Sequence, residues 1–192
     1  MIRASIAAAL VASAMAWSPA REAPSPGQLA DAMLHEMTQT TAVTLGSGPR
    51  VVDVFFDPNC PYCHELYEDL RPWIGSQGLR LRWIPVAVLA RSSEGKAAAM
   101  LQAADPARAL ARNESEYGRN PRAGSGGGLV PATRVTPATR EELARNLKVL
   151  HAAGAYFAFP MMVWRNPSGQ ARMFLGAPRD AAQLKAMLAT VQ

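Results

Sequence analysis

The sequence predicts an α/β protein built around a strand that runs directly into a cysteine-bearing helix. The apolar run from Val51 to Phe56 is typical of a buried strand, and the chain's two cysteines follow it at Cys60 and Cys63. After them, apolar side chains recur at helical spacing, at Leu66, Leu70, Trp73 and Ile74. Helical and strand patterns then alternate to the end of the chain, which indicates a sheet flanked by helices.

The cysteine pair is the strongest candidate for chemistry. Pro61 fits the first helical turn, so Cys60 falls at the N-cap position of the predicted helix. Unpaired N–H groups and the helix dipole stabilise an anion there, which lowers the pKa of a thiol and activates it as a nucleophile. We therefore expect Cys60 to be the solvent-accessible nucleophile. Cys63, one turn inward, is expected to be the less exposed and less acidic resolving thiol.

Three other interpretations of the pair remain open. A structural disulfide across so short a loop would remove only about 2 kcal/mol of unfolded-state entropy. A zinc site needs about four ligands, and the chain offers no second Cys or Cys/His pair, so we expect no metal. Cys60 to His64 also matches the C-x-x-C-H haem-attachment pattern, with His64 as the axial ligand, although that pattern requires no preceding apolar strand. A module that binds without turnover is the remaining alternative.

Composition suits one globular domain with an appendage. The chain has 192 residues and a net charge of +5, but its basic residues are scattered and no nucleic-acid partner is expected. A basic start, an alanine-rich apolar stretch and an A-x-A pattern predict a signal peptide over residues 1–16, cleaved after Ala16 or Ala20. We expect a linker and helix over 17–46 and the catalytic domain over 47–192. An exported protein can work on disulfides.

The remaining elements are predicted in order along the chain. A helix is expected over 27–38 and an edge strand over 41–45, followed by a strand over 79–88 in which Pro85 indicates an edge or a bulge. Helices are expected to start near Ser92 and Asp105. The glycine-rich segment 121–131 is expected to be a flexible loop.

The C-terminal part predicts a helix, a hairpin and a last helix. Thr136 and Pro137 fit an N-cap and a first helical position, and that helix ends at His151. A hairpin is expected from strands over 161–164 and 171–175, and a final helix should bury Leu184, Met187, Leu188 and Val191.

This order of elements resembles the thioredoxin fold with a helical insertion. More narrowly, the segments 55–63, 70–73, 105–107 and 174–178 resemble the catalytic domain of the periplasmic DsbC/DsbG-type disulfide isomerases, the DsbG branch above all. The resemblance runs from about residue 27 to the end. The family's N-terminal dimerisation domain has no counterpart here beyond its linker helix, so a monomer is expected.

The resemblance implies roles for individual residues. Cys60 and Cys63 would be catalytic and form the redox-active disulfide. Tyr62, Phe159 and Pro160 would contact substrate, with Pro160 in the cis-proline loop. The family commonly has threonine where Phe159 stands. Val54 occupies the position, six before the first cysteine, where cytosolic thioredoxins carry a buried acid, and Asp53 and Asp57 are expected to point elsewhere.

The implied activity is thiol–disulfide exchange on exported proteins in the periplasm, as an isomerase or reductase, without a cofactor. Unfolded or misoxidised exported proteins would be the partners, and a membrane electron donor of DsbD type would keep the pair reduced. The same pair could act instead as a disulfide oxidase. Which of these directions prevails depends on the reduction potential of the pair relative to its compartment.

Overall fold

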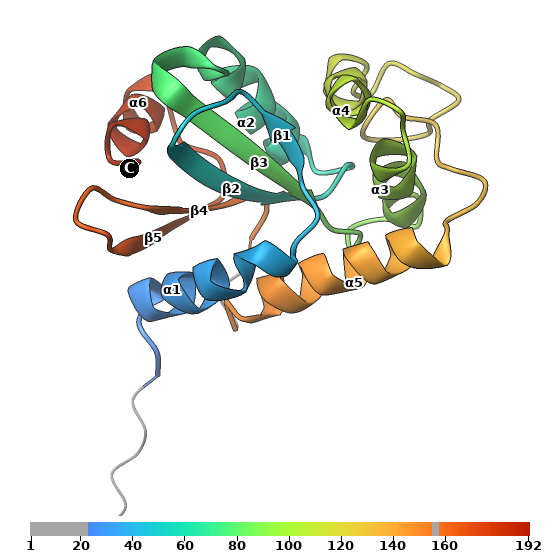
Figure 1. The fold of residues 1–192 in the computed structure, drawn as a ribbon. Coiled ribbons are helices and arrows are strands. Elements are labelled where there is room, and N and C mark those ends of the chain that lie inside the picture. The colour runs from blue at the N-terminus through green and yellow to red at the C-terminus, as the bar shows by residue number, and fades with distance from the viewer. Residues whose placement is uncertain (1–22, 155–157) are drawn as a thin grey trace, which may run out of the picture.

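The computed structural model describes residues 23–154 and 158–192, and these form a mixed sheet enclosed by helices (Figure 1). The five strands lie in the order β1-β3-β2-β4-β5. β2 pairs in parallel with β3, and the other three pairings are antiparallel. The strand bounds are β1 Val43–Leu45, β2 Arg50–Phe56, β3 Leu79–Pro85, β4 Met161–Arg165 and β5 Ala171–Leu175. The expected edge strand near 41–45 and the C-terminal hairpin are confirmed.

The central strand β2 is buried on both faces, which explains its nearly continuous apolar sequence. Val52, Val54 and Phe56 point into one core, together with the cysteines, whereas Phe55 points into a second core on the opposite face. Because side chains alternate along a strand, the end of β2 is fixed between two layers. The residues that follow Phe56 therefore start from the carboxyl end of a strand that is held in place on both faces.

Helices cover both faces of the sheet (Figure 1). α1 (Pro26–Glu36) and α5 (Pro137–His151) pack on the Phe55 face, and α2 (Pro61–Leu70) and α6 (Ala181–Ala189) pack on the other. Short 3₁₀ segments occupy Met37–Gln39, Arg71–Trp73 and Ser76–Gly78. Leu184, Met187, Leu188 and Val191 are buried as predicted. The Thr136 hydroxyl caps α5 by accepting from the Thr139 N–H at 3.1 Å.

Two helices form the insertion beside the sheet, and a long loop returns from them to α5 (Figure 1). α3 spans Ser93–Leu101 and α4 spans Pro106–Ser115. Asp105 caps α4, its carboxylate accepting from the Arg108 N–H at 3.0 Å. The insertion packs against the carboxyl end of β2, where the cysteines lie.

The structure corrects the interpretation of Pro85. β3 lies between β1 and β2, so it is neither an edge strand nor a bulged one. Pro85 is its last residue, and β1 pairs only with Leu81 to Trp83, so no partner strand on that side needs the N–H that proline lacks.

The glycine-rich segment is also different from the expected flexible loop. Gly127 N–H donates to the Pro58 carbonyl at 3.1 Å, and Gly128 N–H donates to the Asn113 carbonyl at 2.8 Å. A Cβ atom at Gly127 would overlap the Asn113 side chain and the Pro58 carbonyl. The glycines therefore allow close backbone approach to the segment that precedes Cys60, rather than conferring flexibility.

The predicted signal peptide lies in residues 1–22, outside the described residues. Within the described part of the chain, every helix is too short or too polar to cross a membrane. α1, which the sequence analysis assigns to the linker and helix, packs against β4, β5 and α5.

Candidate active site

The two cysteines lie at the junction of β2 and α2. Cys60 is the N-cap residue of α2, and Pro61 takes its first position. Both cysteines are free thiols. Cys60 is only 3% exposed and Cys63 1%, so the expected solvent exposure of Cys60 is wrong. The burial of Cys60 is shallow, because Pro61 and Tyr62 beside it are exposed, Tyr62 by 58%.

Hydrogen bonding separates the pKa values of the two thiols. The Cys60 pKa is lowered, chiefly by a hydrogen bond from the Cys63 side chain and further by the backbone N–H groups of Cys63 and Tyr62. Burial and the Asp57 charge oppose this shift. The Cys63 pKa is raised well above the ordinary value, first by burial and then by its interactions with Cys60. The helix N-terminus thus lowers the Cys60 pKa as expected, but the hydrogen bond from the Cys63 thiol lowers it more.

The loop before β4 closes over Cys60. The Phe159–Pro160 peptide bond is cis, and the Phe159 carbonyl oxygen lies 3.8 Å from the Cys60 sulfur. Pro160 is buried, and its own carbonyl accepts from the Gly176 N–H at 2.7 Å. Phe159 is half-buried. The structure therefore brings Phe159, Pro160 and Tyr62 next to the cysteine pair.

Asp57 fixes the turn that precedes Cys60. Its buried carboxylate accepts from the N–H groups of Asn59, Val88 and Leu89 at 2.8 to 2.9 Å, and from the Ser93 hydroxyl at 2.7 Å. These bonds direct the carboxylate toward the 88–93 segment, in agreement with the expectation that it points away from the cysteines. A fully hydrogen-bonded carboxylate of this kind holds a loop in one conformation.

A buried lysine holds the opposite side of the same turn. Lys96, on α3, donates to the Asn59 side-chain oxygen at 2.7 Å and to the Ser125 and Gly127 carbonyls at 2.8 and 2.6 Å. Burial lowers its pKa, while Asp57 and Glu114 act in the opposite direction. The insertion and the glycine-rich loop are thereby fastened to the residue preceding Cys60.

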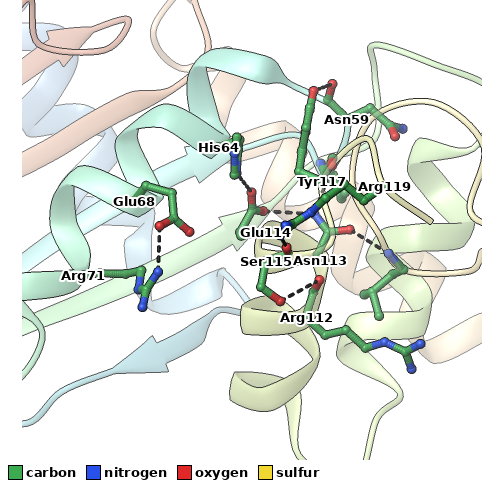
Figure 2. Close-up of polar contacts among 12 residues, drawn as sticks. Asn59, His64, Glu68, Arg71, Arg112, Asn113, Glu114, Ser115, Tyr117 and Arg119 are labelled. Atoms are coloured by element: carbon green, nitrogen blue, oxygen red, sulfur yellow. Dashed lines mark hydrogen bonds and ion pairs between the residues drawn. The ribbon is translucent and has the colours of Figure 1, made fainter.

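The second buried acid near the cysteines is Glu114, at the end of α4. Figure 2 shows it facing His64 of α2, and its Oε2 lies 3.4 Å from His64 Nδ1. Neither of these two atoms has a hydrogen-bond partner, whereas Glu114 Oε1 accepts from Asn113 at 2.9 Å. Burial is the main cause that raises the Glu114 pKa to about 8. The His64 ring stacks on Tyr117 with centroids 4.6 Å apart.

These contacts do not favour the haem interpretation of the motif. His64 is the axial ligand in that interpretation, yet its ring is stacked on Tyr117 and its Nδ1 faces Glu114. Among the described residues, no cluster of three or more His, Cys, Asp or Glu side chains could hold a metal ion.

Sequence reasoning missed Lys96 and Glu114, although a signal existed for both. Lys96 lies four residues before the buried Met100, and Glu114 four residues after the buried Leu110. Because residues four apart share a helix face, the helical spacing predicts that both side chains lie on buried faces. A charged residue on an apolar face indicates a polar partner inside the protein.

Comparisons with known proteins show which proteins the chain is similar to. No family model matches the chain. It is 36% identical over 153 residues to the thiol:disulfide interchange protein DsbG of Pseudomonas aeruginosa, covering 79% of this chain and 57% of that relative. The catalytic domain of Proteus mirabilis ScsC superposes with a TM-score of 0.59 at 18% identity, covering 83% of this chain and 96% of that one. A periplasmic thioredoxin-like protein from Salmonella enterica serovar Typhimurium gives 0.59 at 18%, covering 83% and 94%.

The sheet order, the cysteine pair at a helix N-terminus and the likeness to the ScsC catalytic domain show a thioredoxin-like fold. In sequence the chain is similar to DsbG. The chain spans a little over half of that relative's length, namely 57%.

Proposed function

We propose that this chain catalyses thiol–disulfide exchange on exported polypeptides, with Cys60 as nucleophile and Cys63 as resolving thiol. The observation that carries the proposal is the asymmetry of the pair. The Cys60 pKa is lowered by a hydrogen bond from Cys63 and by helix N–H groups, while the Cys63 pKa is raised. One thiol is thereby prepared to attack and the other is kept protonated until it is needed.

The reaction begins when the Cys60 thiolate attacks one sulfur of a substrate disulfide. A bond forms between Cys60 and that sulfur, and the second substrate sulfur leaves as a thiolate with the electron pair. That thiolate can attack elsewhere in the substrate and release Cys60, which isomerises the substrate. Alternatively, Cys63 attacks the Cys60 sulfur, and the substrate leaves reduced while the enzyme becomes a disulfide.

Isomerase or reductase action is the direction we propose, because a stabilised Cys60 thiolate favours the reduced pair. Only a reduced pair can attack a substrate disulfide in an oxidising compartment. A membrane dithiol donor of DsbD type would return the oxidised pair to the reduced state. The same stabilisation would also make the disulfide form a competent donor, so oxidase action is the second candidate.

Substrate would bind over Tyr62 and Phe159. Tyr62 is an exposed aromatic side chain beside the pair, and Phe159 precedes the cis bond next to the Cys60 sulfur. An extended substrate strand would lie along the Phe159–Pro160 segment, whose cis bond precedes β4. Because Cys60 is covered, the segment at Phe159 must move before the Cys60 sulfur can attack a substrate.

The periplasm is the proposed location. The N-terminal signal pattern supports this location, and so does the fold shared with a periplasmic thioredoxin-like protein. We also propose that the chain acts as a monomer, and light scattering in solution tests this.

A trapping experiment tests the proposed function. With a scrambled, disulfide-bonded protein as substrate, Cys63→Ser should accumulate a mixed disulfide on a non-reducing gel, because the resolving thiol is missing. Cys60→Ser should form no adduct and lose essentially all exchange activity. The unmodified chain should restore the native disulfides of the substrate. Exchange activity retained in Cys60→Ser would contradict the proposal.

A further inference from the structure

The proposed exchange needs an acceptor for the proton that Cys63 loses before it attacks. The thioredoxin position for such an acid is occupied by Val54, and Asp57 is saturated by four hydrogen bonds. The Glu114 carboxyl is different. It is 2% exposed, and its Oε2 has no hydrogen-bond partner and faces His64. A buried carboxyl oxygen without a hydrogen bond destabilises the fold, which indicates a role other than packing.

We propose that Glu114 accepts the Cys63 proton during resolution and releases it to solvent through His64. This inference rests on the proposed function and adds a positioned acid–base pair to it. Glu114 comes from the insertion helix α4, and His64 follows Cys63 directly on α2. The His64 side chain is 30% exposed, so its ring connects a buried carboxyl to water.

Resolution takes place in the mixed disulfide between Cys60 and the substrate. The S–H bond of Cys63 breaks and an O–H bond forms on the Glu114 carboxylate. The Cys63 thiolate attacks the Cys60 sulfur, the new S–S bond forms, and the substrate sulfur leaves as a thiolate with the electron pair. The Glu114 proton then passes to His64 Nδ1 and from the ring to solvent, which returns Glu114 to its carboxylate form.

Charge changes at Cys60 would time this transfer. In the resting protein burial is the main cause that raises the Glu114 pKa and the Cys60 thiolate raises it further, so Glu114 is held protonated at neutral pH. Formation of the mixed disulfide removes the Cys60 charge and lowers the pKa of the acid. Other groups also act on Glu114. Glu68 of α2 raises its pKa, Lys96 of α3 and Asn113 lower it, and its charge acts in turn on Cys63, Tyr67 and Tyr117.

A two-phase assay separates attack from resolution. Reduced full-length chain is mixed with dithiobis-nitrobenzoate in a stopped-flow instrument, and release of the coloured thiolate is followed. The first phase reports attack by Cys60, and the second reports resolution by Cys63. Glu114→Gln should leave the first phase nearly intact and slow the second by about 100-fold at neutral pH, the lower end of general acid–base effects.

The pH profile distinguishes proton transfer from a structural role. In the unmodified chain the second phase should rise with pH and level off as Glu114 ionises. In Glu114→Gln it should keep rising with pH, because only direct ionisation of Cys63 remains. Glu114→Asp, which keeps a carboxyl, should recover the levelling profile. A slow second phase with the unmodified profile in Glu114→Gln would overturn the inference.

Glu116→Gln is the matched control. Glu116 is the C-cap residue of α4, two positions after Glu114. Its side chain pairs with Arg112 and is 38% exposed. Both phases should match the unmodified chain in this variant. If Glu114→Gln does not fold, His64→Phe decides, because it keeps the stacked ring and removes Nδ1. A second phase unchanged in a folded His64→Phe or Glu114→Gln overturns the inference, whereas absence of both phases in the unmodified chain contradicts the proposed function itself.

Discussion

At the residue scale, the reactivity of the site depends on a few hydrogen bonds around one sulfur. Cys60 receives them from the Cys63 side chain and from N–H groups at the start of α2, and these outweigh its burial. The sequence predicts the part that follows from helix geometry, because Pro61 fixes the helix start. It does not predict that Cys60 is covered, since the covering residue, Phe159, is 99 positions away.

Glu114 and Lys96 illustrate the same limit at single residues. Helical spacing places both on buried faces, but their partners come from distant segments, Glu114 meeting His64 and Lys96 meeting Asn59. No local pattern fixes such pairs, because they depend on how the insertion packs on the sheet. The cysteine pair at the start of α2 was predictable because its spacing, strand and helix are all local.

At the scale of elements, the insertion helices and the glycine-rich loop form a support for the turn 57–60. Lys96 of α3, Asn113 of α4 and Gly127 of the loop all bond to that turn. The elements themselves were predicted from caps and periodicity, including the Asp105 and Thr136 caps. The packing of the glycine loop was not, because a run of glycines is compatible with either mobility or close contact.

Gly127→Ala tests this packing. Its Cβ would overlap the Asn113 side chain and the Pro58 carbonyl, so we expect a loss of about 1 to 3 kcal/mol in the free energy of unfolding, together with slower attack by Cys60. Chemical denaturation and the first phase of thiolate release measure these effects. Gly27→Ala is the control, because a Cβ there meets nothing closer than 4.0 Å. Equal stability of the two variants would contradict the packing argument.

At the scale of the whole molecule, buried acids make the stability of the fold depend on pH. The Glu114 pKa is about 8 against an ordinary 4.5, and the Asp53 pKa is about 6 against 3.8, with burial the largest cause for both. Between each pair of values the folded chain keeps a proton that the unfolded chain has released. Stability is therefore highest at the acidic end of these windows and decreases as pH rises through them.

Denaturation of the reduced chain at a series of pH values measures this effect. Between pH 4.5 and 8 the free energy of unfolding should fall with a slope of at most about 1.4 kcal/mol per pH unit from Glu114. Glu114→Gln should remove the Glu114 contribution to this fall, most clearly above pH 6, where the Asp53 contribution has ended, and Glu116→Gln should leave it in place. The lowered Cys60 pKa acts in the opposite direction in all of these proteins. A free energy of unfolding that does not fall with pH relative to that of Glu114→Gln would therefore contradict the account.

The measurement that tests the central claim most directly is the ultraviolet titration of thiolate formation in the reduced chain, with the oxidised chain as the blank. The account predicts that the first thiol to ionise is Cys60, with a midpoint clearly below the 8.5 or so of a free cysteine, and that Cys63 ionises well above it. A first midpoint at or above the free-cysteine value would contradict the account, because neither thiol would then be prepared to attack.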